Sequence, residues 1–309
     1  MKSPVERVLA KLGLPTLLEL LSSRVSGADL TSLLLETMRR RAANVQPADL
    51  LERYTHDRFV APPTTSWSAL RRVEDAITAA CGDYEVIALA PLVPLATHSA
   101  IATVDQNKVV TTIRNSEVAA DPTNALALEA AARRAAALRA DPKSNAIVRL
   151  GASQRVVRAQ LVSGPRHFAH FQLFGLVCAG RDTGGRVFDA RAAAEQLTIH
   201  ARALIALEAD EIRIALTDFS GGEWAAVSTA VRNAIAPLPR ATCVDDPERA
   251  SGRGYYQGFC FKVHVRFGDD AFEVADGGVV DWTQRLVGSA KERCFISGIG
   301  IERLAHARP

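Results

Sequence analysis

Apolar positions in the first part of the chain repeat at helical spacing. In Leu14–Leu21 they fall at i, i+3, i+4 and i+7, and a second such pattern covers Leu30–Ala43 after the start signal Ser26–Asp29. The cluster Val60–Thr65, rich in proline and threonine, then breaks the helical pattern. We therefore expect residues 1–58 to form a small helical segment and residues 59–309 to form the main domain.

Strand patterns appear only in the main domain. Over Phe259–Phe267 apolar and polar residues alternate with period two, and Gly268–Asp270 is a turn before the returning strand Ala271–Ala275. Further strands are expected over Tyr84–Leu89, Lys108–Ile113, Ala146–Gln160, Ala169–Ala179 and Glu211–Leu216, and helices over Trp67–Ala80, Pro122–Ala140 and 189–207. Strands joined by turns and by long helices predict an α/β (α+β) fold, a mostly antiparallel sheet flanked by helices.

Composition narrows the class of protein. The 309 residues are 48% hydrophobic and 23% charged, which is typical of a globular domain. No apolar run reaches the roughly 18 to 20 residues that a membrane helix needs, and the charged N-terminus does not resemble a secretory signal. We expect a cytoplasmic protein without a membrane partner. The five cysteines form no CxxC pair, so no metal site is predicted. The net charge of +3 is too small to indicate nucleic-acid binding.

Ordered motifs in the main domain suggest a family. Arg149-Leu150 precedes Arg158-Ala159-Gln160, the strand Phe171–Gly175 follows a loop, and Gly298–Leu304 reads Gly-Ile-Gly-Ile-Glu-Arg-Leu near the end. In order and spacing these segments resemble the catalytic core of class II aminoacyl-tRNA synthetases of the histidyl type. They also resemble its relative, the regulatory subunit of ATP phosphoribosyltransferase. The resemblance runs from about Arg58 to Leu304.

The first motif of that class is a helix and a strand ending in proline, which build a dimer interface. Trp67–Ala80 and Tyr84–Pro91 are similar to it, so the resemblance implies a homodimer. Any helix–strand unit closed by proline would show the same pattern.

The resemblance also implies a nucleotide site. Arg158 would bind an α-phosphate with its guanidinium fork, and Arg166 on the loop would reach the outer phosphates. Gln160 would face the adenine, and Arg303 with its neighbour Glu302 would lie against ATP. The alternative is that these arginines are surface residues of a two-stranded ribbon.

Other residues are implied as contacts of an amino-acid substrate. Glu117 would hold an ammonium group, and Gln172 lies beside the position of the family's glutamine. Tyr255 and Tyr256 would line the side-chain pocket. Glu117 could instead cap the helix that begins near Asp121-Pro122.

Several family residues are replaced. Ser251 stands where the family has a catalytic arginine, although Arg253 is two positions away. Gln160 replaces a glutamate, Leu173 a glutamine and Val279 an arginine. Loss of an arginine from a bidentate site is not conservative, and it lowers the rate of a reaction more than it lowers binding.

Three functions remain open on the sequence. The sequence ends five residues after Leu304, so we expect neither an anticodon-binding domain nor tRNA as a partner. The first hypothesis is a non-charging paralogue that binds a small ligand, an amino acid or a nucleotide, and regulates a protein partner. The second is a ligase that adenylates an amino or carboxylic acid, with ATP and Mg²⁺ as its cofactors. The third is a structural dimer without a ligand.

Overall fold

The computed structural model describes residues 3–160 and 168–307. Contacts divide the chain into two compact units, Met1–Ala61 with Thr111–Ser116, and Pro62–Val110 with Glu117–Pro309. None of the helices in the described part of the chain combines the length and the apolarity that spanning a membrane requires.

The first unit is built from helices with well-defined starts. Ser3 and Glu6 form a capping box on the first helix, and the Ser26 side chain accepts a hydrogen bond from the backbone of Asp29 in the third. The described residues of these helices include none that is buried. The elements are α1 (Pro4–Leu12), α2 (Leu17–Glu19), a π-helical turn (Leu20–Arg24), α3 (Gly27–Ala42) and α4 (Pro47–His56).

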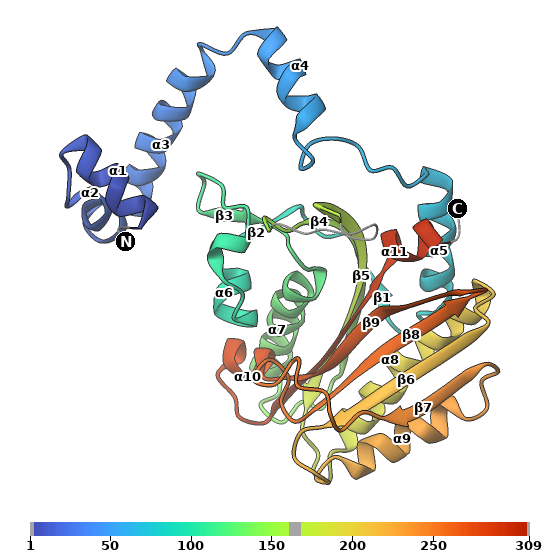
Figure 1. The fold of residues 1–309 in the computed structure, drawn as a ribbon. Helices are drawn as coiled ribbons and strands as arrows, with labels where there is room; N and C mark the ends of the chain where they lie inside the picture. Colours follow the sequence, from blue (N-terminus) through green and yellow to red (C-terminus); the bar gives the residue numbers. More distant parts are fainter. Residues whose placement is uncertain (1–2, 161–167, 308–309) are drawn as a thin grey trace. The chain divides into compact units, whose positions relative to one another are not determined.

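The second unit contains an eight-stranded sheet in the order β1-β4-β5-β10-β9-β8-β6-β7 (Figure 1). The two outer pairs, β1–β4 and β6–β7, are parallel and all other pairs are antiparallel. The mostly antiparallel α/β fold predicted from the sequence is therefore confirmed. The strands are β1 (Glu85–Val86), β4 (Val148–Val157), β5 (His170–Arg181), β6 (Glu211–Asp218), β7 (Ala241–Asp245), β8 (Phe259–Phe267), β9 (Asp270–Val280) and β10 (Glu292–Gly300), and β2 (Leu92–Pro94) and β3 (Ser116–Val118) form a separate pair.

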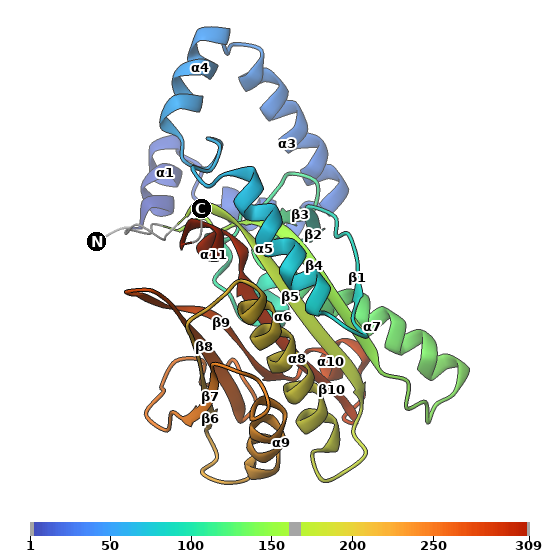
Figure 2. The same cartoon turned by 90° about the vertical axis from the view of Figure 1, so that its right-hand side faces the viewer.

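Helices cover both faces of the sheet, as the two views in Figures 1 and 2 show. One face packs against α5 (Trp67–Ala80), α8 (Val187–Ala206), α9 (Ala225–Ile235) and α11 (Ile301–Ala307). The other face packs against α6 (Thr97–Ala102), α7 (Pro122–Ala140) and α10 (Trp282–Val287), and a 3₁₀ turn follows α6 at Gln106–Lys108.

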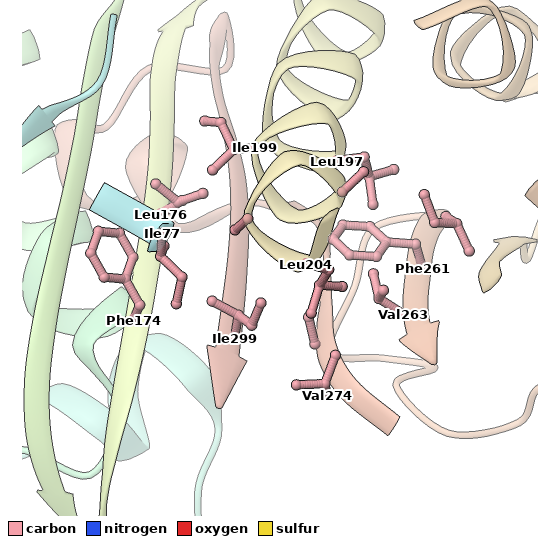
Figure 3. Packing of buried hydrophobic residues seen from close by; sticks show 14 of the residues in the cluster. Ile77, Phe174, Leu176, Leu197, Ile199, Leu204, Phe261, Val263, Val274 and Ile299 are labelled. Carbon is pink, nitrogen blue, oxygen red and sulfur yellow. The ribbon is translucent and has the colours of Figure 1, made fainter. Parts of the chain in front are cut away.

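Side chains of the central strands alternate between two hydrophobic cores, one on each face of the sheet. On β5, Phe174 and Leu176 point toward α5 and α8, whereas Val177 and Ala179 belong to the core under α7. Figure 3 shows the first core, where Phe174 lies near Ile77 of α5. Because both faces are buried, the central strands are rigid supports for the side chains at their ends.

Some predicted elements differ from the structure. The strand expected over Lys108–Ile113 does not form: the segment begins in the 3₁₀ turn, and only Thr111 makes a β-bridge. Its apolar Val109 is buried in a loop, which explains the misleading pattern. Tyr84–Leu89 contains only the short strand β1, and the strand expected over Ala271–Ala275 continues to Val280.

Candidate functional site

A cavity of about 760 Å³ lies within the second unit. Strands β5, β9 and β10, the start of α7 and the segment 249–256 contribute to its lining. Five cationic and five carboxylate side chains line it, so their formal charges cancel. The cations are Lys108, Arg158, Arg249, Lys262 and Arg303, and the carboxylates are Asp105, Asp121, Glu273, Asp276 and Glu302. Such a volume and lining suit a polar small molecule.

Arg158 enters the cavity just after β4. Its Nε donates to the carbonyl of Ala120 at 3.1 Å, and its Nη2 donates to Asp121 Oδ2 at 3.3 Å. The guanidinium carbon lies 5.1 Å from the centroid of the Phe171 ring, a cation–π distance. These contacts fix the guanidinium plane, while 38% of the side chain remains exposed. An oriented, accessible arginine fork is suited to a phosphate or a carboxylate.

Asp121 is the carboxylate opposite Arg158. It is the N-cap of α7, and its Oδ1 accepts hydrogen bonds from the Thr123 backbone at 2.9 Å and hydroxyl at 2.7 Å. The backbone before it is held by His98, whose Nε2 accepts from the Ala120 amide at 3.0 Å. The His98 Nδ1–H then donates to Asn124 Oδ1 at 2.6 Å. Local capping chemistry thus positions a carboxylate in the cavity wall.

Glu117, expected at the ammonium of a substrate, is elsewhere. It is fully buried and accepts hydrogen bonds from the amides of Ala96 and His98 at 3.1 and 2.9 Å and from Gln106 Nε2 at 2.7 Å. It is not among the described residues that line the cavity. The carboxylate that does line it is Asp121, four positions later, at the Asp-Pro helix start that the sequence displayed.

The nucleotide-side residues Arg303 and Glu302 both line the cavity at the start of α11. Arg303 Nη1 donates to the carbonyl of Glu273 at 2.6 Å. Glu302 is buried, and its Oε2 accepts from Arg155 Nη2 at 2.7 Å. Its other oxygen, Oε1, has no hydrogen-bond partner in the described part of the chain. Gln160 also lines the cavity.

Gln172 and Arg166 complete the residues expected from the sequence. Gln172 lines the cavity, but its Nε2 donates to Ser153 Oγ at 2.6 Å and its backbone amide donates to Glu302. Arg166 lies outside the described residues.

Tyr255 and Tyr256 form an aromatic wall. Their ring centroids are 4.8 Å apart in an edge-to-face arrangement, and Tyr255 is also edge-to-face with Trp282 at 5.7 Å. Burial raises the pKa of both hydroxyls well above the ordinary value for tyrosine. Both side chains are therefore neutral hydrogen-bonding groups at physiological pH.

Arg249 is a cavity residue that the sequence did not reveal. The residue is 7% exposed, its guanidinium carbon lies 5.8 Å from the Tyr256 ring centroid, and its Nε donates to the carbonyl of Ser251 at 2.8 Å. Arg253, the expected replacement for the missing arginine, instead stacks over Phe219 at 4.6 Å. It is not among the described residues that line the cavity.

Asp276, on β9, is the second residue missed. It lines the cavity and is exposed there, whereas its strand neighbours Ala275 and Gly277 are buried. Its Oδ2 accepts a hydrogen bond from the Tyr256 hydroxyl at 3.2 Å. Burial, followed by Glu273 and Asp121, raises the pKa of Asp276 above its ordinary value, and Arg249 opposes that rise. The signal in the sequence was a carboxylate within the mostly apolar stretch Val274–Val280.

Clusters of three or more His, Cys, Asp or Glu side chains that could hold a metal ion do not occur in residues 3–160 and 168–307.

Comparison with known proteins gives structural matches only. No family model matches the sequence, and no curated protein matches it. Among solved structures, an ATP phosphoribosyltransferase regulatory subunit/histidyl-tRNA synthetase from Bacillus halodurans matches with a TM-score of 0.58 and 14% identity, over 78% of this chain and 79% of that chain. The apo histidyl-tRNA synthetase of S. aureus matches with a TM-score of 0.59 and 14% identity, over 80% and 69%.

A histidyl-tRNA synthetase from Nostoc matches similarly, with a TM-score of 0.58 and 14% identity over 80% of this chain and 74% of that chain. All of these matches are proteins of the type that the ordered motifs suggested. The chain therefore has the fold of a class II aminoacyl-tRNA synthetase catalytic domain, of the kind found in histidyl-tRNA synthetases and ATP phosphoribosyltransferase regulatory subunits.

Proposed function

We propose that the cavity binds an amino acid, a nucleotide or both, and that the protein is a non-charging paralogue of histidyl-tRNA synthetase with a regulatory role toward a protein partner. The supporting observation is the charge-balanced cavity, in which Arg158 and Asp121 form an oriented pair. An α-amino acid carries one charge of each sign, and the pair offers a partner for each.

The replaced residues favour binding over catalysis. Ser251 lines the cavity but brings no positive charge to it, and Val279 is buried in the core on the other face of β9. Both stand where the family has arginines. Without these two arginines, the negative charge that develops in a transition state loses its stabilisation, and the reaction rate falls by orders of magnitude. Binding of a ligand in its ground state is affected less, because Arg158 is still present.

ATP and Mg²⁺ fit the residues that are present. Arg158 and Arg303 would hold the phosphates and Gln160 the base. Oε1 of Glu302, which is buried and has no hydrogen-bond partner in the described part of the chain, would coordinate Mg²⁺, for which carboxylate oxygens are ordinary ligands. The ion would neutralise phosphate charge.

The second candidate is a ligase that adenylates an amino or carboxylic acid for an acceptor other than tRNA. The observation that favours it is the position of Arg158, since a fixed arginine that bonds a backbone carbonyl and stacks on Phe171 is suited to an α-phosphate. Arg158 would then be the catalytic residue.

We further propose a cytoplasmic homodimer formed through the edge of the sheet. Strand β1 is an outer strand, and the apolar side chains of Val86, Leu92 and Leu95 near it are 41%, 44% and 41% exposed. Exposed apolar groups beside an unpaired strand edge are typical of an interface. Light scattering of the purified protein should give twice the chain mass, and a Leu92→Glu variant should give the monomer mass; a monomeric wild-type protein would contradict the dimer.

The ligand proposal is tested by calorimetric titration with Mg·ATP and with each of the twenty amino acids, alone and together, followed by an assay of pyrophosphate release. We expect binding that Arg158→Ala weakens about tenfold or more. Arg232→Ala is the matched control, because Arg232 is also 38% exposed and paired with an aspartate, Asp245, outside the cavity. Pyrophosphate release that requires Arg158 would establish the ligase instead. Absence of any binding would overturn both.

A further inference from the structure

A second acid–arginine group lies in the same cavity and is not used by the proposed function. It consists of Asp276 on the floor and Arg249 in the wall, with Tyr256 in contact with both. Tyr255 is close enough to Asp121, Arg158 and Asp276 for all three to affect its pKa. The two acid–arginine groups therefore share one cavity, and a single small molecule can contact both.

Arg249 has an unsatisfied donor. The residue is more than nine-tenths buried, and although its Nε bonds the Ser251 carbonyl, its Nη1 has no hydrogen-bond partner in the described part of the chain. A buried guanidinium N–H without an acceptor is costly, and this cost favours a ligand that supplies the acceptor.

Asp276 has an unused acceptor. Its Oδ2 receives the Tyr256 hydroxyl, and no lysine, arginine or histidine of the described residues lies within ion-pair distance of it. A carboxylate that lines a cavity and has no cation within ion-pair distance favours a hydrogen-bond donor from a ligand.

The backbone makes room for this group. Gly252, at φ +89°, has the Tyr256 ring 2.9 Å and Arg249 Nη2 3.3 Å from where a Cβ would lie. At Gly278 a Cβ would meet the Tyr256 ring at 2.8 Å. Both glycines allow Tyr256 to pack between the arginine and the sheet, so the arrangement is built into the chain.

We propose that Asp276 and Arg249 recognise a carboxamide, so that the amino acid bound in the cavity is asparagine or glutamine. The amide N–H₂ donates to Asp276 and the amide oxygen accepts from Arg249 Nη1. The inference rests on the proposed function, which places the α-amino and α-carboxylate groups at Asp121 and Arg158.

Charged side chains fit this group less well. A carboxylate would satisfy Arg249 and repel Asp276, and an ammonium would do the reverse. An imidazole beside Asp276 would take up a proton, since a neighbouring carboxylate raises its pKa, and would then have no acceptor for Arg249. Only a group that donates and accepts while neutral satisfies both residues.

The test is calorimetric titration of the full chain with asparagine, glutamine, aspartate, glutamate, lysine and histidine, with and without Mg·ATP. We expect one carboxamide to bind at least about tenfold more tightly than its carboxylate counterpart. Asp276→Asn removes the repulsion of a carboxylate, so it should reduce that preference about tenfold or reverse it. Its melting temperature and its Mg·ATP affinity serve as controls for folding.

Equal binding of amide and acid by the wild-type protein would overturn the inference, as would a preference for histidine or lysine. A folded Asp276→Asn variant with an unchanged preference would also overturn it. In each of these cases an amino acid still binds, so the proposed function stands. Absence of amino-acid binding in every arm would overturn this inference, and absence of Mg·ATP binding as well would overturn the proposed function with it.

Discussion

Two carboxylates four positions apart, Glu117 and Asp121, lie in different surroundings. Glu117 is fully buried and accepts hydrogen bonds from two backbone amides and Gln106, whereas Asp121 caps α7 and faces Arg158. Both are acidic residues near a helix start, so the sequence alone could not assign them. Burial, which depends on the tertiary structure, decides which one lines the cavity.

The two residues should therefore respond differently to amide substitution. Glu117→Gln replaces an acceptor of three hydrogen bonds by a group with one acceptor, and it should lower the free energy of unfolding by about 1–3 kcal/mol. Asp121→Asn keeps an oxygen for the cap and should instead weaken ligand binding. Urea denaturation and calorimetry on both variants test this; a binding loss in a stable Glu117→Gln variant would contradict it.

Asp189 gives a pH-dependent prediction. This residue in the first turn of α8 is 2% exposed, its Oδ1 has no partner in the described part of the chain, and burial raises its pKa to about 6. Because the folded pKa exceeds the unfolded value, the group destabilises the protein above pH 6, and this cost is removed as the pH falls from 6 to 4.

Asp189→Asn should accordingly be more stable than the wild type by up to about 3 kcal/mol at pH 8, and the difference should disappear near pH 4. Buried His200, whose pKa is lowered to about 3, acts equally in both proteins, so the difference isolates Asp189. Thermal unfolding across this pH range measures it. A difference that is constant with pH would contradict the prediction.

At the scale of elements, a buried ion pair fixes α7, which carries Asp121, to the sheet. Arg134 and Glu292 are both fully buried and joined by two hydrogen bonds of 2.7 and 2.9 Å, and Arg134 also donates to the carbonyls of Ala146 and Ser144. The helix therefore cannot shift along β10 without separating two buried charges.

Arg134→Met should destabilise the protein by about 3–5 kcal/mol, because Glu292 would remain as an unpaired buried charge. The double variant Arg134→Met with Glu292→Met should recover a large part of that loss. Urea denaturation of the two variants measures this, and a double variant less stable than the single one would contradict the cost assigned to the unpaired Glu292.

The elements that sequence patterns predicted well are those with strong local signals. The predicted bounds Trp67–Ala80, Pro122–Ala140 and Phe259–Phe267 agree with α5, α7 and β8. Ser66 and Asp121 cap the two helices, and β8 alternates because its two faces differ in exposure. In contrast, no strand was expected over β10, where Cys294, Phe295 and Ile296 are all buried: a central strand covered on both faces loses the period-two pattern.

At the scale of the whole molecule, the site was only partly predictable. Arg158 and Arg303, like both tyrosines, line the cavity as the ordered motifs implied. Arg249, Asp121 and Asp276 were missed because their roles depend on which side chains the fold brings together, and their positions match no family motif. Motif order thus indicated several residues that line the cavity, but it did not indicate the balance of charge there.

The two compact units should be separable. None of the described residues before Pro62 is buried, and the residues that line the cavity all fall between His98 and Arg303. A chain that begins at Pro62 should therefore unfold cooperatively near the melting temperature of the full chain and bind the same ligand. Calorimetric scanning and titration measure both properties; loss of cooperative unfolding would contradict the division.

The most direct test of the central claim blocks the cavity. Gly298 on β10 lines it and has ordinary backbone angles, and the atoms nearest to where a Cβ would lie are those of the Leu173 side chain and the Phe174 carbonyl, at 3.8–3.9 Å. A Gly298→Leu side chain would project into the cavity without straining the strand. Calorimetric titration should show an amino acid or Mg·ATP binding to the wild-type protein and no binding to the variant, at similar melting temperatures. Equal binding by a folded Gly298→Leu variant would show that the ligand binds elsewhere and would contradict the account.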